Sequence, residues 1–318
     1  MAFAKIPKLP SSDKLFKQCL HDARPKPMRR RKEETPLQAS RKFERERLFA
    51  LRDQLSSRLK KIVTTFPSVD GLSEFYRELI STHIRLDDYK RILGRIQYSS
   101  KTVHELSRTY KGRLEAADSI DDIKKSMSAY IGRLASVIDR LDESFAWLNE
   151  VAKMLGELPV VKKQFTVCIA GFPNVGKTTL FEKITGSAAE VNSYAFTTKR
   201  LNVGSAKFDH YTVQFIDTPG TLNRDHNNAI EEQAALALKY VADLIIYVFD
   251  PTEQYSYDKQ QSLRETMNPL RADTIEFVSK LDIASDEQQE RFVIENRVTD
   301  VDDLRELLLS QAKKYYRL

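Results

Sequence analysis

The chain has 318 residues, of which 41% are hydrophobic and 30% charged, and its formal net charge is +6. This length allows two domains, each large enough to form its own core. No apolar run is long enough for a membrane helix, and the N-terminal residues lack the apolar core of a secretory signal. We therefore expect a soluble protein that is cytoplasmic, or nucleolar only if the source has a nucleus. Two widely separated cysteines and five scattered histidines exclude a disulfide framework and argue against a His/Cys metal site.

Glycine and charge are distributed unevenly. Average usage of roughly 7% would give about 22 glycines, but the chain has 10, and five of them fall between residues 171 and 220. Residues 1–60 hold 17 basic and 7 acidic side chains, whereas the rest of the chain holds 34 basic and 38 acidic ones. The pattern predicts long helices outside the glycine-rich window and a basic N-terminus.

Residues 1–38 contain five prolines and a run of four cations, and have too few apolar residues to fold alone. We predict a basic arm that is extended or partly disordered. Between residues 24 and 47 there are ten basic and four acidic side chains, which favours a polyanionic partner such as a nucleic acid. The alternatives are a solvated charged tail and a nuclear localisation signal. The candidate RNA-binding residues are Arg29, Arg30, Arg31, Lys32, Arg41 and Lys42.

Residues 39–160 are predicted to form a helical bundle. Apolar residues recur at spacings of three and four from Leu48 until Pro67 interrupts the pattern, and Ser119 begins a further pattern that continues to Leu155. The second pattern fits one long helix or two helices joined near Asp142. Shorter amphipathic stripes lie at residues 72–80, 89–96 and 103–114.

Residues 161–318 alternate short β-rich runs with helical stretches, which predicts a doubly wound α/β sheet with ligands at the carboxyl ends of the strands. The expected strands are 165–170, 201–208, 211–216, 244–249 and 274–278. The expected helices lie around 178–184, 229–241, 257–266, 285–290 and 301–314. The fold class is therefore a helical bundle followed by an α/β domain.

A phosphate-binding loop follows the first expected strand. The segment GFPNVGKT has the spacing G-x-x-x-x-G-K-[ST] between a strand and a helix, where backbone N–H groups and the helix N-terminus can hold a polyanion. Lys177 would reach the β- and γ-phosphates, and the Thr178 hydroxyl would ligate Mg²⁺. The expected nucleotide-binding residues here are Gly171, Phe172, Pro173, Asn174, Val175, Gly176, Lys177, Thr178 and Thr179.

Two further segments fit a nucleotide switch. Asp217, Thr218, Pro219 and Gly220 form a DxxG motif at the end of a strand, where the carboxylate can hold Mg²⁺ and the glycine N–H can sense a γ-phosphate. Thr197 and Thr198 lie in a loop between the two motifs, and one of them is a candidate second Mg²⁺ ligand and phosphate sensor.

The base is expected to be read by Ser279, Lys280, Leu281 and Asp282, which follow the strand 274–278. In GTPases the corresponding segment is NKxD, whose carboxylate accepts hydrogen bonds from guanine. Asp282 and Lys280 fit this pattern, but Ser279 stands where asparagine is usual and keeps only a hydroxyl for hydrogen bonding. A solvated charged turn is the alternative.

The segments GFPNVGKTTL, YAFTTKRLNVG, DTPG and ADLIIYVFD resemble the Obg-type GTPases, and within them the nucleolar GTP-binding protein (Nog) branch. In the helical half, FPSVDGLSEFY and DYKRILG resemble that branch's N-terminal domain. The resemblance implies a GTPase with GTP and Mg²⁺ that acts in assembly of the large ribosomal subunit, with the helical domain on rRNA. The length is similar to that of short archaeal members, and off the ribosome we expect a monomer without membrane association.

Hydrolysis is expected to be slow without an external activator, because Thr221 stands where many small GTPases carry the water-orienting glutamine after DxxG. Lys177, Asn174 and Thr198 are the candidate catalytic residues. Asn174 resembles an asparagine that helps coordinate an activating K⁺ in some related GTPases, or else it only shapes the loop. The last guanine loop of the family has a Ser-Ala pair, and only residues 294–296 lie near its place. The rival interpretations are a structural RNA-binding module with incidental turnover, and an RNA-modification or stress-response GTPase.

Overall fold

The computed structural model describes residues 3, 6–24, 34–186, 192–194, 201–218, 229–252, 254–294 and 297–317. The chain divides into two compact units. The bundle unit comprises Lys5–Gly71 and Ile84–Gly156, and the sheet unit comprises Met1–Ala4, Leu72–His83 and Glu157–Leu318. The predicted fold class, a helical region followed by an α/β domain, is confirmed. In the parts of the chain that the structure describes, none of the helices is long and apolar enough to cross a membrane.

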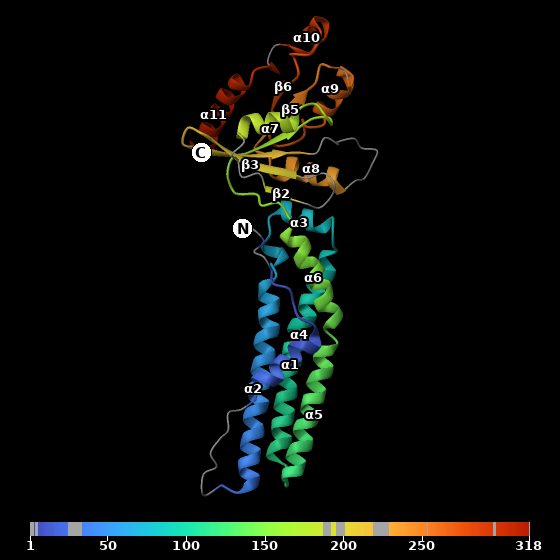
Figure 1. Ribbon diagram of the computed structural model, residues 1–318, viewed down its shortest axis with the longest axis vertical. Helices are drawn as coiled ribbons and strands as arrows, with labels where there is room; N and C mark the ends of the chain where they lie inside the picture. Colours follow the sequence, from blue (N-terminus) through green and yellow to red (C-terminus); the bar gives the residue numbers. More distant parts are fainter. Residues whose placement is uncertain are drawn as a thin grey trace. The chain divides into compact units, whose positions relative to one another are not determined.

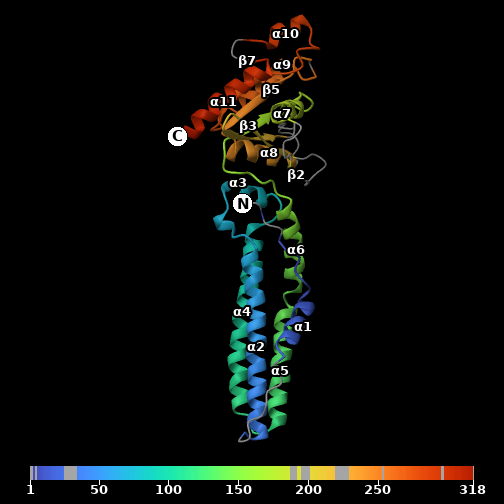
Figure 2. The ribbon, with the colours of Figure 1, turned by 60° about the vertical axis from the view of Figure 1, so that its left-hand side comes forward.

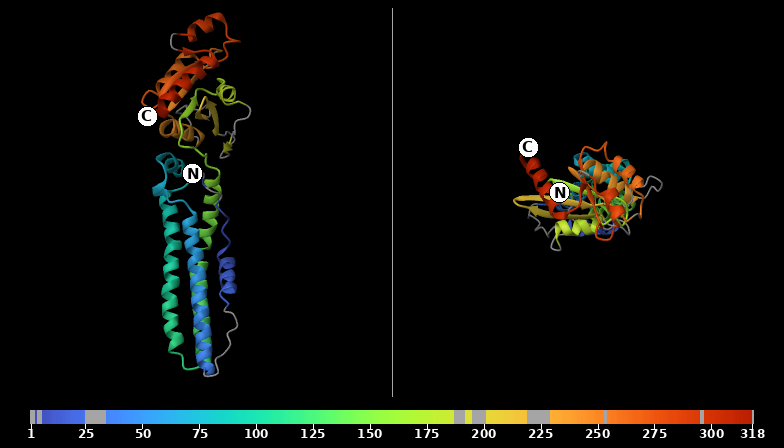
Figure 3. Two further views of the ribbon diagram at one scale, coloured as in Figure 1. Left: turned by 90° about the vertical axis from the view of Figure 1, so that its left-hand side faces the viewer. Right: turned by 90° about the horizontal axis from the view of Figure 1, so that it is seen from above.

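The core of the bundle unit lies among three long helices that run side by side, α2 (Pro36–Thr65), α4 (Leu86–Glu115) and α5 (Ile120–Asp139) (Figures 1 and 3). Helix α6 (Asp142–Gly156) follows α5 after a short break, as in the second of the two predicted arrangements. The regularly spaced leucines of α2 are completely buried, and burial of such a side chain stabilises a fold by about 1.5–3 kcal/mol. They are Leu48, Leu51, Leu55 and Leu59.

Local capping fixes where two of these helices begin. Thr35 and Gln38 form a reciprocal capping box at the start of α2, with Pro36 in the first turn, where its missing N–H costs nothing. The Ser119 hydroxyl accepts the N–H of Asp122 at 3.1 Å and begins α5, as the sequence predicts.

The predicted arm is not wholly extended, because residues 12–22 form helix α1 (Ser12–Asp22). Leu15, Phe16 and Cys19 form one buried face of α1, which packs beside α2 and α5 (Figure 2). The Asp142 carboxylate accepts the N–H of Ser12 at 2.9 Å and holds the start of this helix. The sequence did not predict this helix, because its short apolar stripe lies among prolines and cations and is buried only against the folded bundle.

Helix α3 (Glu74–Ser81) belongs to the sheet unit, although the predicted boundary places all of residues 39–160 in the bundle. Its Tyr76 hydroxyl donates to the carbonyl of Pro159 and accepts the N–H of Val161, both at 2.9 Å. Leu79 and Ile80 are buried, and the helix packs against α8 (Ala229–Tyr240). A short 3-10 helix, η1 (Val69–Gly71), precedes it.

The sheet unit is built on a seven-stranded mixed sheet in the order β2-β3-β4-β1-β5-β6-β7. Strand β3 pairs antiparallel with β2 and β4, and the other pairs are parallel. All five predicted strands are present, and β2 and β7 were missed because strands of three and two residues cannot show alternation. The strands are β1 (Thr166–Ala170), β2 (Asn192–Tyr194), β3 (Leu201–Phe208), β4 (Tyr211–Asp217), β5 (Leu244–Phe249), β6 (Asp273–Val278) and β7 (Arg297–Val298).

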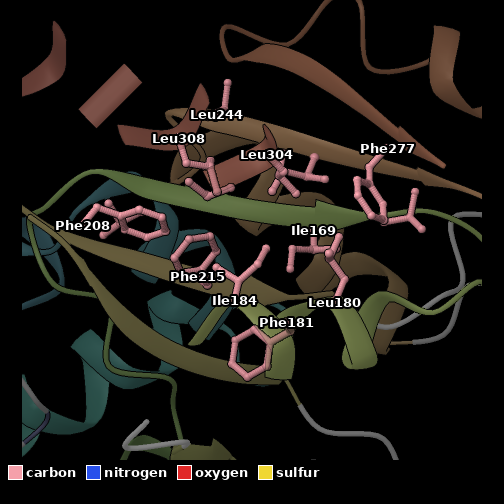
Figure 4. Packing of buried hydrophobic residues seen from close by; sticks show 14 of the residues in the cluster. Ile169, Leu180, Phe181, Ile184, Phe208, Phe215, Leu244, Phe277, Leu304 and Leu308 are labelled. Carbon is pink, nitrogen blue, oxygen red and sulfur yellow. The ribbon is translucent and has the colours of Figure 1, made fainter. Parts of the chain in front are cut away.

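Helices cover both faces of this sheet. On one face, α7 (Lys177–Thr185) and α11 (Val301–Arg317) pack over the strands, and Figure 4 shows Phe181 and Ile184 of α7 beside Phe215 of β4. On the other, the Cys168 thiol of β1 contacts the carbonyl of Ala237 in α8. Helices α9 (Tyr257–Glu265) and α10 (Asp286–Phe292) both contact strand β5. This doubly wound arrangement places the loops after β1, β4, β5 and β6 at one edge.

Candidate nucleotide-binding site

The phosphate-binding loop joins buried β1 to α7. Gly171 has φ +144°, and a Cβ there would lie 2.7 Å from the carbonyl oxygen of Val248, so only glycine fits. Gly176, with φ +93°, forms the N-cap of α7, and Lys177 is the first residue of the helix. The first N–H groups of a helix have no partner within it and carry its positive dipole end. The loop therefore has the backbone of an anion site, as the motif predicts.

Lys177 is buried at the centre of this loop. Its side chain is 6% exposed, and its Nζ donates to the carbonyl oxygen of Phe172 at 2.5 Å. Phe172 itself stacks on Tyr255, with ring centroids 4.3 Å apart. The ammonium group therefore lies inside the loop, where it can face bound phosphate.

Asp217 ends β4 directly beside the phosphate loop. Its Oδ2 accepts hydrogen bonds from the Thr178 hydroxyl at 2.7 Å and from Asn202 Nδ2 at 3.2 Å. Its Oδ1 is buried without a hydrogen-bond partner among the described atoms. Burial raises the pKa of this carboxyl, and the hydrogen bonds from Thr178 and Asn202 partly offset that effect. A buried carboxylate oxygen without a partner, next to a hydroxyl, is a donor set that fits Mg²⁺.

Of the remaining predicted switch residues, the structure describes Thr218. Thr218 turns its hydroxyl into the sheet and donates to the carbonyl of Ile169 at 2.6 Å, so that hydroxyl holds the strand end rather than facing a ligand. The predicted Thr197, Thr198, Pro219 and Gly220, together with Thr221, lie outside the described residues.

The expected guanine loop follows β6 and contacts the phosphate loop. The Ser279 hydroxyl lies 2.7 Å from the carbonyl oxygen of Val175 and 3.0 Å from that of Phe249. Lys280 Nζ donates to the carbonyl of Asn174 at 2.6 Å. The side chains of Ser279 and Lys280 thus join the loop after β6 to the phosphate loop.

Asp282 is exposed, and no hydrogen bond joins its carboxylate to another described residue, so it is free to meet a ligand. Leu281 accepts a hydrogen bond from Gln289 at its carbonyl oxygen. Near the expected last guanine loop, Ile294 is described and residues 295–296 are not.

Two residues of this site were missed by the sequence reasoning. Asn202 lies opposite Asp217 in the pairing of β3 with β4, and its spacing along the chain gives no sign of that. Asp250 follows β5 and pairs with Lys280 Nζ at 2.6 Å. The sequence could have identified Asp250 as a site residue, because a polar residue directly after a buried parallel strand lies at the ligand-binding edge of the sheet.

The predicted RNA-binding residues divide into two groups. Arg29, Arg30, Arg31 and Lys32 lie outside the described residues. Arg41 donates to the carbonyl of Ala117 at 2.7 Å, and Lys42 lies 3.6 Å from Glu34, so both side chains have partners within the bundle.

Comparison with known proteins follows the same division of the chain. Residues 3–162 match the family of NOG1 N-terminal helical domains, and residues 166–280 match the family described as 50S ribosome-binding GTPases. An uncharacterised protein of Methanocaldococcus jannaschii is 32% identical over 292 residues, which are 90% of this chain and 82% of that protein. Nucleolar GTP-binding protein 1 of Drosophila melanogaster is 33% identical over 266 residues, covering 81% of this chain and 41% of that protein.

Among solved structures, the G domain of the FeoB iron transporter of T. maritima is 26% identical, with a TM-score of 0.38 over 47% of this chain and 98% of that one. The phosphate loop, its lysine and the guanine loop define a P-loop GTPase, which is the enzyme class of the matching family. The chain belongs to the NOG1 family, whose N-terminal domain it carries next to the GTPase domain. It spans less than half the length of the nucleolar relative.

Proposed function

We propose that this GTPase acts as a switch in assembly of the large ribosomal subunit. In its GTP state it binds a precursor subunit through rRNA, and hydrolysis of GTP to GDP and phosphate releases it. The observation that carries the proposal is the direct link between phosphate loop and guanine loop, in a domain whose family is described as 50S ribosome-binding GTPases.

In this proposal the nucleotide binds across the two loops. Backbone N–H groups of residues 171, 172 and 174–179 and the Lys177 ammonium hold the phosphates, with Pro173 shaping the loop, and the Asp282 carboxylate accepts hydrogen bonds from guanine. The burial of Lys177 supports the first role, and the exposure of Asp282, whose carboxylate bonds to none of the described residues, supports the second.

Thr178 and Asp217 would hold Mg²⁺, together with Thr197 or Thr198. When bound, the ion would supply positive charge that offsets the negative charge developing on the transferred phosphoryl group. Two observations support this site. Asp217 Oδ1 is buried without a hydrogen-bond partner among the described atoms, and Asp217 Oδ2 lies 2.7 Å from the Thr178 hydroxyl.

Hydrolysis would be slow in the isolated protein, since Thr221 cannot orient water as a glutamine does. Lys177 and Thr198 would stabilise charge on the transferred phosphoryl group. Asn174 would help to bind K⁺ beside the phosphates, and its exposed side chain on the loop supports this role. Equal turnover in K⁺ and Na⁺ buffers would show that Asn174 has no such role.

The base-reading role is tested by competition among GTP, ATP and xanthosine triphosphate. Asp282→Asn should weaken GTP binding at least about tenfold, the change that 1.4 kcal/mol produces, and shift preference toward xanthosine triphosphate. Asp286→Asn, at another exposed aspartate in the first turn of α10, is the matched control and should not alter the preference. If Asp282→Asn keeps the preference of the unaltered protein, Asp282 does not read the base.

The switch role is tested by cosedimentation with precursor large subunits in GTP, GDP or a slowly hydrolysed GTP analogue. We expect binding with GTP and the analogue, and release with GDP. Equal binding in all three states would favour the alternative, a structural RNA-binding module in which turnover is incidental.

The arm would supply the charge contact to rRNA. If six to ten of its cations meet phosphate, raising salt from 50 to 200 mM should weaken RNA binding by roughly 10³- to 10⁵-fold on the duplex scale. Replacing Arg29, Arg30, Arg31 and Lys32 by alanine should flatten that dependence. We further propose that the protein is a cytoplasmic monomer when off the ribosome, which sedimentation of the free protein would test.

A further inference from the structure

The buried carboxylate of Asp250 lies at the carboxyl end of β5, between the guanine loop and the loop that follows the strand. The side chain is 1% exposed. Its Oδ2 accepts a hydrogen bond from Lys280 Nζ at 2.6 Å, and its Oδ1 accepts hydrogen bonds from the N–H and the hydroxyl of Thr252 at 2.9 and 2.6 Å. Both carboxylate oxygens are therefore occupied, and the group has one orientation.

The backbone of Asp250 is held as firmly as its side chain. Gln260, which is completely buried, accepts the Asp250 N–H at 2.9 Å and donates to the Asp250 carbonyl at 2.8 Å. The same amide donates to the carbonyl of Tyr255, whose ring stacks on Phe172 of the phosphate loop. Since Gln260 lies on α9, that helix fixes the place of the carboxylate.

Lys280 receives its orientation from this carboxylate. Its backbone has φ +54°, an uncommon conformation for a residue other than glycine, and its ammonium lies between Asp250 Oδ2 and the carbonyl of Asn174, with 2.6 Å to each. A lysine ammonium has three N–H donors, so one remains for a ligand. The carboxylate compensates the charge and directs it toward the phosphate loop.

We infer that Asp250 is a positioning residue for nucleotide binding: through Lys280 it holds the guanine loop and the phosphate loop together before nucleotide arrives. This inference rests on the proposed function of the two loops. Ser279 explains why such a residue matters here, because its single hydroxyl hydrogen can serve only one of the two carbonyls beside it. The Lys280 link, anchored by Asp250, supplies the second connection between the loops.

The test is a double-mutant cycle on the affinity for a fluorescent GDP analogue in Mg²⁺ buffer, with the full chain. Asp250→Asn and Lys280→Met should each weaken binding, by roughly tenfold to a hundredfold for groups in contact. If Asp250 acts through Lys280, the double variant should bind no more weakly than Lys280→Met alone. A purely structural role would make the two losses multiply.

The control is Asp243→Asn, which alters an exposed aspartate just before the other end of β5. Asp243 Oδ2 accepts the N–H of Thr166 at 2.9 Å and has no link to Lys280, so this variant should keep the affinity for GDP. Where Asp250→Asn does not fold, Asp250→Glu keeps the charge but displaces the carboxylate, and an intermediate loss is expected.

Affinity like that of the unaltered protein in Asp250→Asn or Asp250→Glu would overturn the inference, as would multiplicative losses in the double variant. If the unaltered protein binds GTP and GDP but Asp250→Asn does not change the affinity for GDP, only the positioning role fails. If the unaltered protein binds no guanine nucleotide, the proposed function and the inference fail together.

Discussion

Asp217 shows how a site residue is held at a cost to stability. Burial raises its pKa, so the native protein holds the proton more tightly than the unfolded chain does. The protonated carboxyl therefore favours the fold below the unfolded-state pKa, and that contribution is lost as pH rises through the native pKa. When this carboxyl is ionised, the fold buries a charge on a group whose Oδ1 has no hydrogen-bond partner among the described atoms.

We therefore predict that Asp217→Asn raises the free energy of unfolding of the nucleotide-free protein at pH 7 by about 1 kcal/mol, the order of an unsatisfied buried group. The gain should shrink as pH falls toward the range where the carboxyl is protonated. Urea unfolding in EDTA at several pH values measures this, with the exposed Asp282→Asn as control. A less stable variant at pH 7 would contradict the argument. In the same variant, GDP affinity should lose its dependence on Mg²⁺.

Gly171 has no room for a side chain, because a Cβ would meet the Val248 carbonyl at 2.7 Å in a left-handed conformation. Gly171→Ala should cost about 1–3 kcal/mol of stability and abolish nucleotide binding. Gly132→Ala is the matched control, since it lies inside α5 with nothing within 4 Å and should stabilise by about 0.5–1 kcal/mol. Thermal unfolding and GDP titration of the two variants compare these outcomes.

At the scale of elements, the place of α3 in the fold could not be predicted from its sequence. Its stripe of Phe75, Leu79 and Ile80 predicts a helix, and the helix forms. The same stripe would fit a bundle or a sheet equally well. The Tyr76 hydroxyl, bonded to Pro159 and Val161, attaches it to the segment that leads into β1.

Removing that hydroxyl should loosen the attachment. Tyr76→Phe leaves the Val161 N–H and the Pro159 carbonyl without this partner, which should lower the free energy of unfolding by about 1–3 kcal/mol. Tyr98→Phe on α4 removes a hydroxyl from a side chain that is 65% exposed, and no change is expected there. Denaturant unfolding distinguishes the two. Equal stability of both variants would show that the Tyr76 bonds contribute nothing.

At the scale of the whole molecule, the two units have separate cores. A mutation that destabilises one core should therefore be distinguishable from the stabilisation of the other unit by a ligand. Leu134 is completely buried in the bundle unit, and Leu134→Ala should destabilise that unit by about 2–5 kcal/mol. GDP at a hundred times its dissociation constant should stabilise the sheet unit by about 2.7 kcal/mol.

We predict that Leu134→Ala leaves GDP affinity unchanged and that GDP protects amides of the sheet unit, measured by hydrogen exchange. Phe215→Ala, in the core of the sheet unit, is the counterpart and should weaken both protection and binding. Loss of GDP affinity in Leu134→Ala would show that the bundle core contributes to the nucleotide site.

The sequence by itself determined the main helices, five of the strands and the phosphate loop, because each depends on local spacing: apolar periodicity, capping residues, or glycines around a lysine. The tertiary structure decided which unit α3 joins, that α1 packs in the bundle, and that the Arg41 guanidinium donates a hydrogen bond to the Ala117 carbonyl. It alone brought Asp250, Lys280 and Asn174 together, across 106 residues in the case of Lys280 and Asn174. Such contacts depend on strand order and on a shared edge of the sheet, which local spacing does not encode.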